Sequence, residues 1–173
     1  MLVLGLDPGL ATTGYGLVRE TESGDLELVE YGAIITPAAD AMPKRLLDID
    51  RELHTLIDRR QPDVVAIEEL FFCKNVTTAL IVGQARGVII LGAARFKLPI
   101  FEYKPMEIKQ AVAGYGKAPK SQVQEMVRML LNLERIPQPD DAADGIAVAV
   151  CHIHNNRLAS MINASRTNHD RPN

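Results

Sequence analysis

The chain contains no tryptophan, few other aromatic residues and only two cysteines, Cys73 and Cys151. Two cysteines are too few for the disulfide framework of a small secreted domain. The sequence opens without a basic segment followed by an apolar one, so we expect a cytoplasmic protein. Its most apolar stretch, residues 79–94, is interrupted by Gln84 and Arg86 and is too short and too polar to span a bilayer.

A strong net charge is also missing. The formal charge of −3 argues against a simple polycation that coats nucleic acid. The charges are unevenly distributed, because residues 71–130 carry nine Lys and Arg against three Glu, whereas the rest of the chain is acidic. A localised basic face is sufficient to bind a phosphate backbone. Solvated helix faces give the same pattern, and charge alone favours that simpler explanation.

The length of 173 residues and the 47% of hydrophobic residues are typical of one globular domain. Three apolar runs with tight turns predict an antiparallel meander, and a later run reached through a helix predicts a parallel strand. The predicted strands are residues 2–6, 15–19, 26–35, 64–67 and 98–101. One predicted helix begins at Pro43, and another begins at Ser121, which is its expected N-cap. Three further predicted helices cover residues 75–96, 105–113 and 140–158. We therefore expect an α/β domain over residues 1–160, with a five-stranded mixed sheet flanked by helices, and a polar, flexible tail over residues 161–173.

Four acidic residues stand where acids are structurally inconvenient. Asp7 and Glu68 each end an apolar strand, and Asp141 and Asp144 lie three residues apart at the start of the last helix. Residues with that spacing share a helix face, and the carboxyl ends of neighbouring strands meet at one edge of a sheet. Taken singly, Asp7 is an ordinary turn residue, Glu68 a solvated strand end, and the other two acids helix caps. The functional interpretation depends on the convergence of all four.

Convergent carboxylates repel one another and cannot all remain ionised without cations. Their hard oxygen ligands favour Mg²⁺ or Mn²⁺ over zinc. Two such ions at one site can support phosphodiester hydrolysis. A soft-metal alternative at Cys151, His152 and His154 is weaker, because His152 does not share the helix face of the other two and no further zinc ligands lie nearby.

Several motifs together resemble the RuvC-type Holliday-junction resolvases. The match begins with Gly5-Leu-Asp-Pro-Gly9 and Thr13-Gly-Tyr-Gly16, and it covers roughly residues 1–158. It continues in order through Ala66-Ile-Glu68, Phe71, Lys74, Asn75, Gly83-Gln-Ala-Arg-Gly87, Lys109-Gln110, Lys120-Ser-Gln122 and Asp141-Ala-Ala-Asp144. The combination is highly specific, whereas Asp-Pro-Gly alone is a weak signal.

The resemblance implies an RNase H-like fold and a homodimeric nuclease that cuts two opposed strands of a four-way DNA junction during recombination and repair. It also implies cooperation with a RuvA–RuvB branch-migration complex. By the same match Asp7, Glu68, Asp141 and Asp144 are the catalytic residues and hold Mg²⁺ or Mn²⁺, with two ions per site. Phe71, Lys74, Lys109, Tyr115, Lys117 and Lys120 correspond to DNA contacts, with Phe71 stacking on an unpaired base. Glu69 and Asp140 adjoin two of the acids, so either could replace or assist its neighbour.

Two other classes of function fit part of the sequence. Asp7-Pro-Gly9 with Thr12-Thr13 also resembles the first phosphate loop of sugar kinases and actin-like ATPases, but those proteins need two such domains and nothing here repeats the loop. A binder that kept the fold and lost its metals is disfavoured because all four acids are present, and a relative acting on RNA stays open. Helix 75–96, with its small residues Gly83 and Gly87, is a candidate dimer interface.

Overall fold

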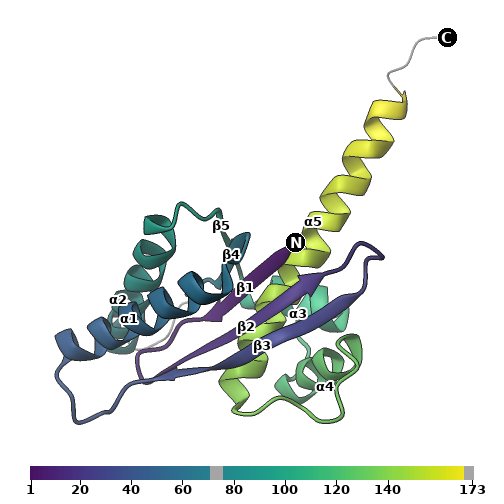
Figure 1. Cartoon of the computed structure of the whole chain (residues 1–173). Helices are drawn as coiled ribbons and strands as arrows, with labels where there is room; N and C mark the ends of the chain where they lie inside the picture. Colours follow the sequence, from purple (N-terminus) through teal and green to yellow (C-terminus); the bar gives the residue numbers. More distant parts are fainter. Residues whose placement is uncertain (71–75, 170–173) are drawn as a thin grey trace.

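The computed structural model describes residues 1–70 and 76–169, with side chains through residue 161. Five strands in this part of the chain form one mixed sheet in the order β3-β2-β1-β4-β5 (Figure 1). β1, β2 and β3 are antiparallel neighbours, whereas β4 runs parallel to both β1 and β5. The strands are β1 (Leu2–Asp7), β2 (Thr12–Glu20), β3 (Leu26–Ile35), β4 (Val64–Glu68) and β5 (Ile100–Tyr103). This arrangement confirms the predicted five-stranded mixed sheet.

The described helices cover both faces of the sheet (Figure 1). α1 and α2 pack together on one face, and α3 and α4 pack with α5 on the other. The helices are α1 (Met42–Arg60), α2 (Val76–Arg95), α3 (Pro105–Ala113), α4 (Lys120–Leu130) and α5 (Asp140–His169). The sheet thus lies in the middle of three layers, and α5 crosses the two central strands, β1 and β2.

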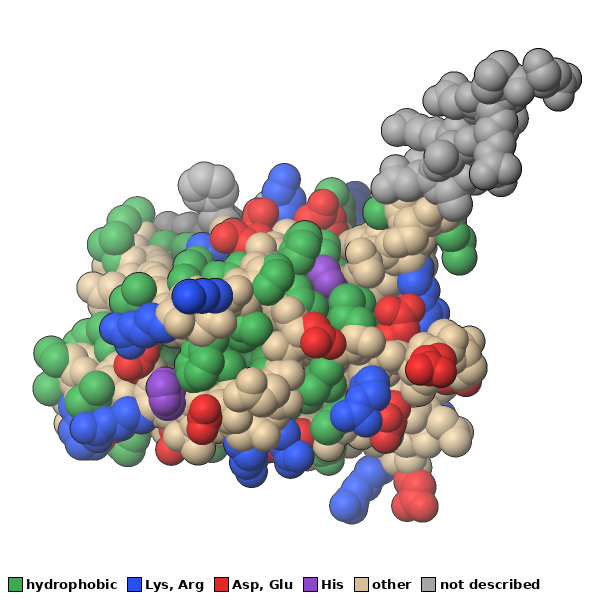
Figure 2. Space-filling model, turned by 45° about the horizontal axis from the view of Figure 1, so that its top comes forward, with side chains coloured by type: hydrophobic (Ala, Val, Ile, Leu, Met, Phe, Trp, Pro, Cys, Tyr) green, Lys and Arg blue, Asp and Glu red, His purple; other side chains and the backbone are tan. Residues whose placement is uncertain are grey.

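Residues 79–94, expected to be too short and too polar to span a bilayer, belong to α2, which as a whole is the one helix in the described residues long and apolar enough to do so by length and composition. One such helix is weak evidence for a membrane span, because core helices of soluble proteins have the same properties. In this structure α2 packs against α1 and buries Ala85, Ile89 and Ala93. Exposed hydrophobic side chains are also visible at the left of Figure 2, over the part of the molecule where α1 and α2 lie.

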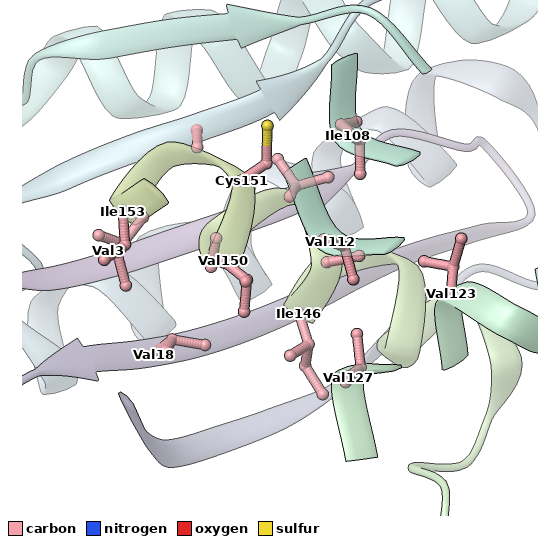
Figure 3. Close-up of a cluster of buried hydrophobic side chains, with 14 of the residues drawn as sticks. Val3, Val18, Ile108, Val112, Val123, Val127, Ile146, Val150, Cys151 and Ile153 are labelled. Atoms are coloured by element: carbon pink, nitrogen blue, oxygen red, sulfur yellow. The ribbon is translucent and has the colours of Figure 1, made fainter. Parts of the chain in front are cut away.

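Alternation along the strands divides the core into two clusters. Val3 on β1 faces the α5 side, whereas Leu4 is buried under α1 and α2. Figure 3 shows the first cluster, in which Val3 and Val18 of the sheet approach α5 while α3 and α4 supply further aliphatic side chains. Because β1 and β4 have helices on both faces, they are buried on both sides, as expected for parallel strands in a layered α/β domain.

Several boundaries differ from the sequence predictions, among them the start of β2, which is Thr12 rather than residue 15. β5 begins at Ile100 rather than residue 98, because Lys97 has a left-handed backbone with φ 58° and Pro99 has no N–H to donate. α4 begins at Lys120 after Pro119 as N-cap, without a side-chain cap, so the expected capping role of Ser121 is wrong. α5 continues to His169 instead of ending at residue 158, and its last turns project from the body of the molecule (Figure 1).

Candidate active site

Two carboxylates come from the ends of adjacent parallel strands. β1 and β4 are paired through Leu6 and Ile67, so the next residues, Asp7 and Glu68, lie side by side at the carboxyl edge of the sheet. Their side chains are hydrogen-bonded to each other. The hydrogen bond favours the protonated form of Glu68 and the ionised form of Asp7, because an ionised carboxylate only accepts hydrogen bonds.

Two further carboxylates come from the first turns of α5. Asp141 and Asp144 share a helix face, and both are partly buried. Carboxylate oxygens of Asp7, Asp141 and Asp144 all lie within 4.8 Å of one another. Glu68 joins this group through its hydrogen bond to Asp7. The four acids predicted from the sequence thus meet at one place, between a sheet edge and a helix start.

Glycines set how closely α5 approaches the sheet. A Cβ atom on Gly14 of β2 would lie 1.8 Å from the carbonyl oxygen of Asp141, and one on Gly5 of β1 would lie 2.3 Å from that of Gly145. Larger residues at these strand positions would force α5 away from β1 and β2. Both glycines belong to the motifs near the N-terminus, but the sequence carries no signal for their role, which is to let Asp141 and Asp144 lie next to Asp7.

Burial and mutual repulsion raise the pKa values of these acids. Burial and the nearby Asp144 carboxylate raise the pKa of Asp7 to about 6. Burial and the adjacent Asp7 raise the pKa of Glu68 to about 8. The pKa of Asp144 is also raised by burial, although its hydrogen bond with Lys120 acts in the opposite direction. The group therefore carries more negative charge than its surroundings stabilise, which is the electrostatic condition for cation binding.

A cavity of about 430 Å³ opens over these carboxylates. Lys109 of α3 and Lys120 of α4 lie in its wall, and the Nζ of Lys120 donates a hydrogen bond to Asp144 Oδ2 at 2.7 Å. The other residues that line it include Asp7, Glu68, Glu69, Leu70, Val82, Arg86, Ile108 and Asp144. The cavity therefore combines cation ligands with basic side chains that can contact a phosphate group.

The family model for crossover junction endodeoxyribonuclease RuvC matches residues 3–152. The chain belongs to the RuvC family. The RuvC of Chloroflexus aggregans is 56% identical over 154 residues, covering 89% of this chain and 93% of that protein. The RuvC of Syntrophomonas wolfei is 52% identical over 167 residues and covers 96% of both chains.

Solved structures agree with this family assignment. The T. thermophilus RuvC in complex with a Holliday junction substrate is 31% identical, with a TM-score of 0.84, over 91% of this chain and 96% of that one. The yeast mitochondrial Holliday junction resolvase shares the fold at 17% identity and a TM-score of 0.68, over 95% of this chain and 85% of that one. These matches confirm the RNase H-like fold that the resemblance implied.

The other residues predicted from the RuvC resemblance do not all meet at this cavity. Lys109 and Lys120 line it, whereas Tyr115 and Lys117 line a second cavity of about 600 Å³ between α3, the following loop and α5. Phe71 and Lys74 lie outside the described residues. The two acidic neighbours also differ from each other. Glu69 lines the active-site cavity, while the side chain of Asp140 is 58% exposed and lies 3.9 Å from Lys120.

The sulfur and imidazole groups of α5 have separate structural partners. Cys151 is buried in the core, His152 is hydrogen-bonded to the hydroxyl of Tyr103 at 2.8 Å, and Nδ1 of His154 lies 2.9 Å from the carbonyl oxygen of Ala111. Metal-binding groups among the described residues include no cluster of these three side chains. The structure therefore favours the structural interpretation over a soft-metal site.

Proposed function

We propose that this RuvC-family chain resolves four-way DNA junctions by cutting two opposed strands through metal-dependent hydrolysis of phosphodiester bonds. The observation that carries the proposal is the cavity lined by Asp7, Glu68 and Asp144 together with Lys109 and Lys120, with Asp141 next to Asp7 and Asp144. On the resemblance alone, we also propose that it acts in the cytoplasm with a RuvA–RuvB branch-migration complex.

We propose Mg²⁺ or Mn²⁺, with two ions per site, as the cofactor. The donor set fits these ions, because it consists of carboxylate oxygens within 4.8 Å of one another and lacks the nitrogen and sulfur ligands that zinc prefers. Asp7, between Glu68 and the two aspartates of α5, is the natural shared ligand. When bound, such ions activate water and stabilise the leaving oxygen.

The protein side chains position the DNA for this reaction. Lys109 and Lys120 lie on the α3 and α4 side of the cavity, where they can bind the backbone phosphates of the strand to be cut. Asp144 holds Lys120 beside the acids through their 2.7 Å hydrogen bond. Water is the attacking group in this reaction, so no covalent enzyme–DNA intermediate forms.

The test is incubation with an end-labelled mobile four-way DNA junction in Mg²⁺ or Mn²⁺. We expect paired nicks at symmetric positions in opposed strands, with ends that DNA ligase can seal. A linear duplex of the same sequence is the control and should remain intact. Cleavage of branched RNA in preference to the DNA junction, binding without cleavage in either metal, or ATP hydrolysis without junction binding would each contradict the proposal.

We also propose that the active form is a homodimer, because two symmetric cuts require two equivalent sites. One face of α2 supports this proposal. Its exposed residues recur at helical spacing, and a Cβ on either of the two glycines would meet nothing within 4 Å in the chain. We call this face the α2 stripe; it consists of Val76, Leu80, Gly83, Gln84, Gly87 and Leu91. A solvent-exposed apolar stripe with small residues suits close packing against a second copy.

Leu80→Glu is expected to convert the dimer to a monomer at micromolar concentration, because it places a charge on the apolar surface of the α2 stripe. Light scattering coupled to gel filtration measures the molar mass, and the junction assay should show a loss of paired nicks. Met129→Glu on α4 is the matched control, since Met129 is similarly exposed on another helix. A wild-type protein that is monomeric under these conditions would contradict the dimer.

A further inference from the structure

Arg86 reaches the active-site cavity from the opposite side to the two lysines. It lies on α2, four residues after Val82, and both residues line the cavity on the face of the helix away from the α2 stripe. α2 covers one face of the sheet, whereas α3 and α4, which carry Lys109 and Lys120, cover the other. The carboxylate group at the strand ends is therefore flanked by basic side chains from both layers.

The guanidinium of Arg86 is only partly used by the protein. Its Nη2 is paired with the Glu102 carboxylate of β5, and the side chain is 19% exposed. Its Nε is buried and has no hydrogen-bond partner among the described residues. A buried N–H without a partner is costly, so a purely structural arginine is expected to use its planar fork more completely. Arg86 thus retains hydrogen-bonding capacity at the wall of the cavity that contains the acids and the two lysines.

Glu102 places this guanidinium near the reacting groups. In the β4–β5 register Glu102 is the partner of Ile67, the residue just before Glu68. The pair therefore lies one residue from the strand end that supplies an active-site acid. The Glu102 side chain is 43% exposed, so water can solvate its carboxylate when Arg86 moves to another anion. Exchange of partners therefore leaves no buried, unpaired charge.

We propose that Arg86 binds a backbone phosphate of the DNA strand being cut, on the α2 side of the cavity, and that Glu102 holds its guanidinium when DNA is absent. Arginine suits this task because its planar fork can make two parallel hydrogen bonds to phosphate oxygens, which a lysine ammonium cannot do in the same way. The inference rests on the proposed function and adds a substrate-binding residue to it. The strand is then held from both layers of the fold.

The test couples Arg86 to individual phosphates. Four-way junctions are prepared with a single neutral methylphosphonate at each position near the cut, and single-turnover cleavage is measured for wild type, Arg86→Gln and Arg86→Lys. We expect Arg86→Gln to lower the cleavage rate about 10- to 100-fold. The rate of Arg86→Lys should lie between those of the wild type and Arg86→Gln. At one position the methylphosphonate should slow the wild type strongly but cause little further loss in Arg86→Gln.

Arg95→Gln is the matched control, because Arg95 lies on the same helix and is paired with Asp50 away from the cavity. It should cleave like the wild type and respond to every methylphosphonate as the wild type does. Melting temperatures of all variants identify any loss of folding, and a loss explained by misfolding alone would slow all junctions equally. Additive effects of Arg86→Gln and the methylphosphonate at every position would overturn the proposal.

Junction binding in Ca²⁺ is measured for the same combinations of protein variant and methylphosphonate junction, so that the role of Arg86 is tested even without cleavage. A wild type that binds but never cuts would remove the proposed function, while coupling of Arg86 to one phosphate in the binding data would still support the contact. A wild type that cuts, with no coupling in either assay, would remove the Arg86 assignment and leave the proposed function intact.

Discussion

Asp7→Asn is expected to lower the rate of junction cleavage at least about 10³-fold, because ions held by the acids contribute several kcal/mol of charge stabilisation in the transition state. Asp7 occupies the centre of the group, hydrogen-bonded to Glu68 and within 4.8 Å of ligand atoms on Asp141 and Asp144. Asparagine keeps the size of the side chain but loses its charge. Junction binding should persist, since the lysines of the cavity are unchanged. Single-turnover cleavage and a gel-shift assay measure the two quantities.

Asp58→Asn is the control for the loss of one negative charge, because Asp58 is exposed on α1 and is not among the residues that line the cavity. It should cleave at the wild-type rate. Cleavage by Asp7→Asn within tenfold of the wild type would show that Asp7 is not a ligand, and the assignment of the acids would have to be revised.

The same substitution should stabilise the metal-free protein at neutral and higher pH. The pKa of Asp7 is about 6 in the fold against an ordinary 3.8, so the folded state keeps a proton that the unfolded chain has released. Stability of the wild type therefore falls as pH rises through about 4 to 6 and stays low above that window. Asparagine cannot ionise and escapes this loss.

Thermal unfolding in EDTA at pH 4 and pH 8 measures this effect. The variant should melt above the wild type at pH 8 and close to it at pH 4. Addition of Mn²⁺ should raise the melting temperature of the wild type at pH 8 more than that of the variant, since bound cations replace the missing proton. Equal pH dependence of the two proteins would contradict the electrostatic account of the site.

The acidic group could be predicted because topology fixes its geometry. Once the strands ending at Asp7 and Glu68 are parallel neighbours, their last residues must adjoin, and the spacing of Asp141 and Asp144 places both on one face of α5. These relations depend on sequence order and helical periodicity alone. The RuvC resemblance then supplied the chemistry for four acids that were each unremarkable when considered singly.

Other features depended on packing that periodicity does not encode. Tyr115 and Lys117, which are predicted DNA contacts, line a second cavity beside α5, and their position apart from the acids could not be read from periodicity. The pairing of Arg86 with Glu102 joins a helix to an edge strand sixteen residues away, and it requires the β4–β5 register to be known. Close approach of α5 to the sheet is likewise a property of three elements together, visible only once the glycines are placed.

Gly14→Ala is expected to impair both stability and cleavage, because the added Cβ would lie 1.8 Å from the carbonyl oxygen of Asp141. The first turn of α5 must move by roughly 1 Å or more, and overpacking of this kind costs about 1–3 kcal/mol. A displacement of 1 Å in a reacting constellation can cost about 10²-fold in rate. We therefore expect a lower melting temperature and a cleavage rate reduced at least about 10²-fold, with weaker stabilisation by Mn²⁺ than in the wild type.

Gly83→Ala adds the same methyl group where nothing lies within 4 Å in the chain, and alanine is the better helix former. Compared with the wild type at a protein concentration where both have the same oligomeric state, it should melt at the same temperature or slightly higher. If Gly14→Ala matched the wild type in melting temperature and cleavage, the contact between β2 and α5 would not be what places Asp141. A Gly14→Ala protein that folds stably but no longer responds to Mn²⁺ would show that this backbone contact acts through the position of the carboxylates.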